Sequence, residues 1–101
     1  MATLTRQQVL DRIAEVEPEL RRMHVTRLEL FGSVARDEAT DASDVDMLVE
    51  FEEGVPVGLF HFYRVEQYLE QLLGMSVDLT LRRAVIPELR ERIYGEAIRA
   101  A

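Results

Sequence analysis

The stretch FGSVARDEATDASDVDMLVEF, from Phe31 to Phe51, decides the fold that we predict for this chain. It begins with two small residues, Gly32 and Ser33, crosses an acidic polar segment, and ends in an apolar run that contains Asp44 and Asp46. Successive residues of a strand point to opposite faces of a sheet. The apolar residues at positions 45, 47, 49 and 51 therefore share one face, and both carboxylates lie on the other.

Two further segments alternate in the same way. In VTRLELF at residues 25–31, Leu28 and Leu30 point one way and Arg27 and Glu29 the other. In MSVDLT at residues 75–80, the apolar residues at positions 75, 77 and 79 share one face. Asp78 lies on the polar face of the second segment, as Asp44 and Asp46 do in theirs. The sequence therefore predicts three strands, two of which carry aspartates on the polar face.

Helices are predicted in three stretches outside these strands, where apolar residues recur at helical intervals. Thr5 and Gln8 have the spacing of a capping box, so a helix begins near residue 5, and Pro18 either kinks it or starts a second short helix. Gly74 suits the end of a helix whose apolar face is expected to comprise Leu59, Phe62, Val65, Leu69 and Leu73. Pro87 suits the first turn of a last helix, with an apolar stripe at Leu89, Ile93 and Ala97.

A short helix is also expected at Gly32 and Ser33, where the first strand ends. The order of elements is then helix, strand, helix, strand, helix, strand, helix. It predicts one small α/β or α+β domain over residues 1–101, with a three- or four-stranded sheet covered by helices on one side. The chain of 101 residues is long enough to bury one core but too short for a second domain.

Composition excludes several classes of function. Nineteen acidic against twelve basic residues give a net charge of -7, so we expect no stable direct binding of nucleic acid. The chain has no cysteine, which excludes disulfides and thiolate metal sites. No apolar run is long enough to span a bilayer and no signal segment is evident, so we expect a soluble cytoplasmic protein without a membrane partner.

The aspartates predict a metal site. Asp44 and Asp46 leave the same face with Cα atoms roughly 6.6 Å apart. If the strand of Asp78 lies beside theirs, three carboxylates meet on one open face and repel one another unless a cation joins them. Oxygen ligands of this kind suit Mg²⁺, completed by water and substrate phosphates. An Asp-x-Asp pair by itself is also compatible with a solvated strand edge.

The Gly-Ser pair predicts an anion site at the end of the first strand. Gly32 allows the backbone to approach a phosphate, and the Ser33 hydroxyl and nearby amides can donate to it. A metal site beside such a turn is typical of phosphoryl or nucleotidyl transfer.

The combination resembles the signature of the nucleotidyltransferase superfamily that includes DNA polymerase β. Its parts are Gly-Ser, the intervening residues 34–43, Asp-x-Asp in a strand and a third aspartate in a later strand. LFGSVARDEATDASDVDMLVEF, followed by SVDLT and IPELRERIYGEAI, is similar to the minimal nucleotidyltransferase (MNT) branch from about Leu28 to the C-terminus. Such proteins are commonly encoded beside a HEPN-domain RNase and act as its antitoxin.

The resemblance implies a mixed sheet with helices mainly on one face, and it implies roles for single residues. Gly32 and Ser33 would contact the triphosphate, and Arg36 would meet phosphate or steady the turn, the second being favoured. Catalysis and metal binding would fall to Asp44, Asp46 and Asp78, the last able to activate the acceptor hydroxyl. Asp37 departs from the family pattern, because relatives often have glycine there.

The implied function is Mg²⁺-dependent transfer of AMP from ATP to a hydroxyl of a HEPN RNase toxin, with tyrosine the expected acceptor. The protein would then be an antitoxin that acts by AMPylation. Two alternatives remain open. The chain could be a non-catalytic antitoxin that neutralises the toxin by binding, or a nucleotidyltransferase with a small-molecule acceptor.

Overall fold

The computed structural model describes residues 3–101, in which helices and strands follow the predicted order. The first half contains α1 (Arg6–Glu15), α2 (Glu17–Arg22), β1 (Val25–Phe31), α3 (Gly32–Ala35) and β2 (Val45–Phe51). The second half contains α4 (Leu59–Leu73), β3 (Val77–Leu81), a 3-10 turn η1 (Arg82–Ala84), α5 (Pro87–Glu96) and β4 (Ile98–Arg99). None of the helices formed by residues 3–101 combines the length and apolarity that a membrane span requires.

The strands form one mixed sheet in the order β3-β2-β1-β4. β1 is antiparallel to β2 and to β4, whereas β2 and β3 are parallel because α4 connects them as a crossover. This confirms the predicted mixed sheet. The fourth strand is the two-residue β4, which follows the last helix and pairs with Glu29 and Leu30 of β1.

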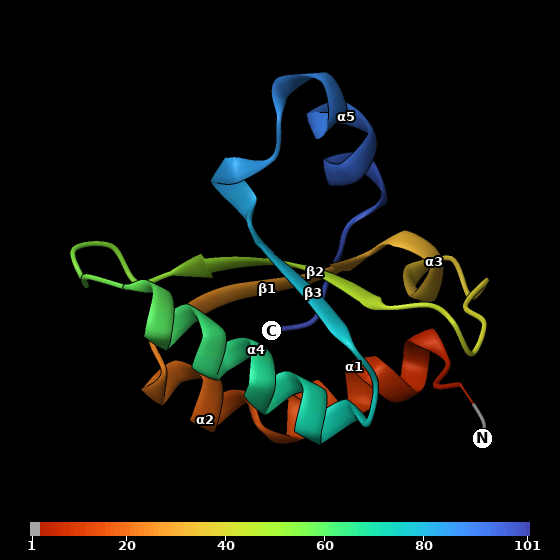
Figure 1. The fold of residues 1–101 in the computed structure, drawn as a ribbon, viewed down its shortest axis with the longest axis horizontal. Coiled ribbons are helices and arrows are strands. Elements are labelled where there is room, and N and C mark those ends of the chain that lie inside the picture. Colours follow the sequence, from red (N-terminus) through yellow and green to blue (C-terminus); the bar gives the residue numbers. More distant parts are fainter. Residues whose placement is uncertain (1–2) are drawn as a thin grey trace.

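The helices lie mainly on one face of the sheet, as predicted. In Figure 1, α1, α2 and α4 lie on one side of the strands and α5 on the other. The apolar face of β2 packs into the main core through Val45, Met47 and Val49, all fully buried. Leu48 points the opposite way and forms a smaller buried cluster with Val85 and Ile93, which fixes α5 over the polar face of the sheet.

Local signals in the sequence account for several helix ends. Thr5 and Gln8 form the predicted capping box at the start of α1. Pro18 does not kink a continuous helix but lies in the first turn of the separate helix α2. Gly74 ends α4 in the left-handed conformation, with φ of 67°.

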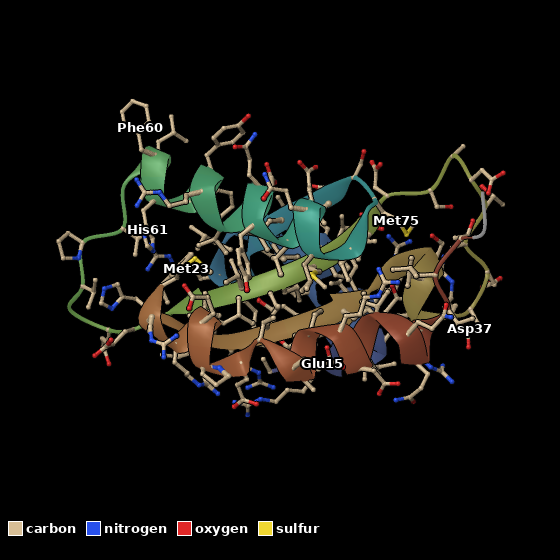
Figure 2. All side chains as sticks on the ribbon, turned by 90° about the horizontal axis from the view of Figure 1, so that it is seen from below. Glu15, Met23, Asp37, Phe60, His61 and Met75 are labelled. Carbon is tan, nitrogen blue, oxygen red and sulfur yellow. The ribbon has the colours of Figure 1, made fainter. Side chains whose placement is uncertain are left out.

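The apolar stripe predicted for α4 is wrong at its first residue. Val65, Leu69 and Leu73 are buried, but Leu59 is 81% exposed. The first turn of the helix borders an open hollow beside the β2–α4 loop and does not lie on the core. Figure 2 shows the neighbouring Phe60 pointing away from the molecule at this end of α4.

Candidate active site

Asp46 and Asp78 lie next to each other on the parallel strands β2 and β3, where they are direct register partners. Their neighbours Val45 and Val77 are buried in the main core, so both carboxylates point to the opposite face of the sheet. Asp46 is partly buried and Asp78 is exposed. The register thus joins two residues that are far apart in the sequence.

Asp44 lies just before β2 and not within it. The ladder with β3 begins at Val45, which pairs with Val77 and whose amide donates to the Ser76 carbonyl (2.8 Å). Asp44, which was predicted to lie within the strand, therefore precedes it. Asp44 is exposed in the preceding loop and still close enough to Asp46 to affect its ionisation.

The pKa of Asp46 is raised from its ordinary value. Burial is the main cause, followed by repulsion from Asp78 and from Asp44, while Arg36 acts in the opposite direction. Negative charge at this point of the sheet is thus only partly compensated by the protein. A bound cation would relieve the repulsion.

The donors at this place fit Mg²⁺. In the part of the chain from residue 3 to 101, no three His, Asp or Glu side chains converge closely enough to hold an ion by themselves. Mg²⁺ sites commonly use only one or two carboxylates and take their other ligands from water and substrate phosphates. Asp46, with Asp44 or Asp78, supplies the hard oxygen ligands that such a site needs.

Gly32 brings the chain directly against the Asp46 side chain. It begins α3 with φ of 76°, a conformation that residues with a Cβ rarely adopt. A Cβ at this position would collide with the Asp46 carboxylate. Gly32 is therefore required both for the turn and for the close approach of the turn to the carboxylates. Ser33 follows at the same place and lines a hollow together with Gly32 and Asp46.

Arg36 has two acidic partners behind this turn. Its Nε donates to Glu38 (2.8 Å), and its NH1 group donates to Glu96 (3.0 Å). These hydrogen bonds, Glu38 first and then Glu96, raise the pKa of Arg36. The contacts agree with the favoured interpretation that Arg36 steadies the turn.

Asp37 adopts a backbone conformation that is more typical of glycine. Its φ is 56°, in the left-handed region that favours glycine and that aspartate tolerates better than most residues. The carboxylate accepts from the Arg6 backbone amide (2.8 Å) and forms an ion pair with the Arg6 guanidinium (3.6 Å). Figure 2 places Asp37 beside the start of α1, so its charge is directed to that helix.

Two residues of α5 belong to the site but were not predicted from the sequence. Glu96 accepts from the Gly32 amide through Oε1 (3.0 Å) and from Arg36 through Oε2 (3.0 Å). Arg92 lies one helical turn earlier and lines the same hollow of about 500 Å³ as Gly32 and Asp46. The only signal in the sequence was the spacing of these charged residues beside Ile93 on an amphipathic helix.

A larger hollow, of about 1050 Å³, lies at the other end of the sheet. The ends of β2 and β3 and the β2–α4 loop line it, and it contains none of Asp44, Asp46 or Asp78. We assign the chemistry to the smaller hollow, because only that one joins a carboxylate of the sheet to the Gly-Ser turn.

Comparisons with known proteins agree with this geometry. Residues 13–100 match the family described as nucleotidyltransferase domain. The chain is 38% identical over 99 residues to the protein adenylyltransferase MntA of Thermococcus cleftensis, covering 97% of this chain and 98% of that protein.

Two solved structures show the same fold. One described as a minimal nucleotidyltransferase is 39% identical, with a TM-score of 0.80 over 97% of this chain and 98% of that one. A complex of an MNT antitoxin with a tri-AMPylated HEPN toxin from Shewanella oneidensis matches at 18% identity, with a TM-score of 0.64 over 92% of this chain and 71% of that one. With the register of Asp46 and Asp78 beside the Gly32 turn, these matches show that the chain belongs to the nucleotidyltransferase domain family, in its minimal (MNT) branch.

Proposed function

We propose that this nucleotidyltransferase transfers AMP from ATP to a hydroxyl of a HEPN RNase toxin, with tyrosine as the acceptor, and thereby acts as an antitoxin. The observation that carries the proposal is the placement of Asp46 and Asp78 as register partners beside the Gly32 turn. The name of the Thermococcus relative, a protein adenylyltransferase, supports a protein as the acceptor. The reaction is expected in the cytoplasm, where ATP is available.

Each residue has a part in this reaction. The turn at Gly32 and Ser33 receives the triphosphate. Asp44 and Asp46 would hold Mg²⁺, with Asp78 as a further ligand and with phosphate and water oxygens completing the set. Mg²⁺ held by these residues would supply the positive charge that neutralises and aligns the phosphates. The acceptor oxygen forms a bond to the α-phosphorus, the bond to pyrophosphate breaks, and Asp78 takes the proton of the hydroxyl.

Exposure of the site favours a large acceptor. Asp78 is exposed and Asp46 is only partly buried, so a protein side chain can reach both from solvent. Exclusion of water as the substrates meet strengthens the electrostatic interactions in the site and prevents loss of AMP to hydrolysis. A docked toxin can cover the exposed side of the site, whereas a small-molecule acceptor cannot.

We expect the purified protein to bind ATP measurably with Mg²⁺ and only weakly without it. The negative charge of Asp44, Asp46 and Asp78 repels a triphosphate unless a divalent cation lies between the carboxylates and the phosphates. Isothermal titration calorimetry with Mg²⁺ and with EDTA measures the difference. Equal affinity under both conditions would remove the argument for a metal site.

Incubation with Mg²⁺, ATP and the proposed partner, a HEPN RNase, should add one or more AMP groups to that RNase. Intact-protein mass spectrometry detects each addition. Because general-base catalysis typically contributes about 100- to 10,000-fold, we expect Asp78→Asn to slow the transfer at least about 100-fold.

A non-catalytic antitoxin would behave differently in the same experiment. It would inhibit the RNase stoichiometrically without nucleotide, would weaken as salt screens its acidic surface, and would hardly respond to Asp78→Asn. An unmodified RNase whose inhibition persists without ATP would rule out catalysis as the mechanism.

A further inference from the structure

The positive charge of Arg36 is neutralised by ion pairs within the protein. Glu38 lies 2.8 Å from its Nε, and Glu96 lies 3.0 Å from its NH1 group. Glu96 also accepts from the Gly32 amide, so one carboxylate joins the guanidinium to the turn. A cation with two carboxylate partners offers little net charge to a phosphate.

Arg92 is in a different situation. It lies on α5 and is exposed, and its side chain has no hydrogen-bond or ion-pair partner among residues 3–101. Arg92 lines the same hollow as Gly32, Ser33 and Asp46. Among the charged residues of this hollow, Arg92 is thus the cation whose donors are not engaged elsewhere.

The position of Arg92 over the hollow is fixed by its neighbours. The next residue, Ile93, is buried with Leu48 of β2 and Val85, which holds this turn of α5 against the sheet. Glu96, four residues after Arg92, accepts hydrogen bonds from the Gly32 amide and from Arg36, so the following turn is held as well. The backbone of Arg92 is therefore anchored while its side chain remains free to reach a ligand.

We propose that Arg92 is the residue that contacts the phosphates of the bound nucleotide, whereas Arg36 acts as a positioning residue for the turn. This inference rests on the proposed function and assigns a ligand contact within that same site. A triphosphate brings several negative charges to a hollow that already contains Asp46 and Glu96. An arginine with unengaged donors matches phosphate geometry through two parallel hydrogen bonds.

The test is calorimetric titration of a non-hydrolysable ATP analogue in Mg²⁺. We expect Arg92→Ala to raise the Kd about 10- to 100-fold, the range for loss of hydrogen bonds to a charged group. Arg92→Lys should recover part of the affinity, because it keeps the charge but not the paired donors. Arg64→Ala is the matched control, since Arg64 is also exposed, has no ion-pair partner among residues 3–101, and lies on α4 across the sheet from α5. It should leave the Kd within about twofold.

Inorganic tripolyphosphate identifies the part of the nucleotide that Arg92 contacts. We expect Arg92→Ala to weaken tripolyphosphate and the ATP analogue by similar factors and to leave adenosine binding unchanged. Unchanged affinity for both phosphate ligands in Arg92→Ala would overturn the proposal, and so would a loss confined to adenosine. If wild-type protein binds the analogue but transfers no AMP, the proposed function fails while the assignment of Arg92 stands.

Discussion

Asp46→Asn is expected to reduce AMP transfer about 1000-fold or more without unfolding the protein. Asp46 is the partly buried carboxylate between Asp78 on the neighbouring strand and the Gly32 turn. An amide keeps the shape but supplies neither the charge nor the paired oxygens that a divalent cation needs. Stabilisation of transferring phosphoryl groups by such a cation amounts to several kcal/mol, which corresponds to a factor of this size. The rate of AMP incorporation into the HEPN RNase measures the loss.

The melting temperature separates a catalytic role of Asp46 from a structural one. Its pKa is raised in the folded protein, chiefly by burial and then by Asp78, so ionisation of Asp46 disfavours the fold. The stabilising contribution of protonated Asp46 is present below its unfolded value of 3.8 and is lost as the pH rises through the folded pKa. At pH 7, Asp46→Asn should therefore melt no lower than wild type, and any gain should vanish below pH 3.8.

Asp11→Asn is the matched control for this substitution. Asp11 lies on the exposed surface of α1, so its substitution makes the same change from acid to amide at a place away from Asp46 and Asp78. It should leave AMP transfer within about twofold of wild type. A markedly lower melting temperature for Asp46→Asn at pH 7 would make Asp46 a structural residue and contradict the assignment.

The strands and the candidate carboxylates were predictable because both follow from alternation. The period of two places Asp46 on the face opposite Val45 and Met47, whatever the rest of the fold is. Asp78 has the same relation to Val77 and Leu79. Alternation does not determine which strands are neighbours, and the structure shows that β2 pairs with β3.

Features that depend on the orientation of a helix were not predictable. The roles of Arg92 and Glu96 follow from the angle at which α5 crosses the sheet, which the cluster of Leu48 with Ile93 determines. β4 has two residues and thus no period that a sequence could show. Leu59 fits the helical stripe of α4 but is exposed, because the helix begins beside a hollow.

Gly32→Ala is expected to destabilise the fold by about 2–5 kcal/mol. A Cβ in the left-handed region costs about 1–2 kcal/mol. A second cost of about 1–3 kcal/mol arises from crowding, because this Cβ would collide with the Asp46 carboxylate. Urea unfolding at pH 7 measures the sum. The variant should also lose AMP transfer, since the turn and Asp46 cannot both keep their places.

Gly74→Ala measures the cost of the backbone strain without a collision, so its difference from Gly32→Ala gives the cost of the collision. Gly74 has a similar φ of 67°, but a Cβ there would meet nothing within 4 Å. It should cost only the backbone part, about 1–2 kcal/mol. In an Asp46→Ala background the carboxylate is gone, so Gly32→Ala should cost much less there than in wild type, and the double-mutant cycle should give a coupling on the order of 1 kcal/mol or more. If Gly32→Ala costs no more than Gly74→Ala and the cycle shows no coupling, then the Asp46 side chain moves aside freely. The turn and the carboxylate would in that case not form the fixed pair that the proposed nucleotide site requires.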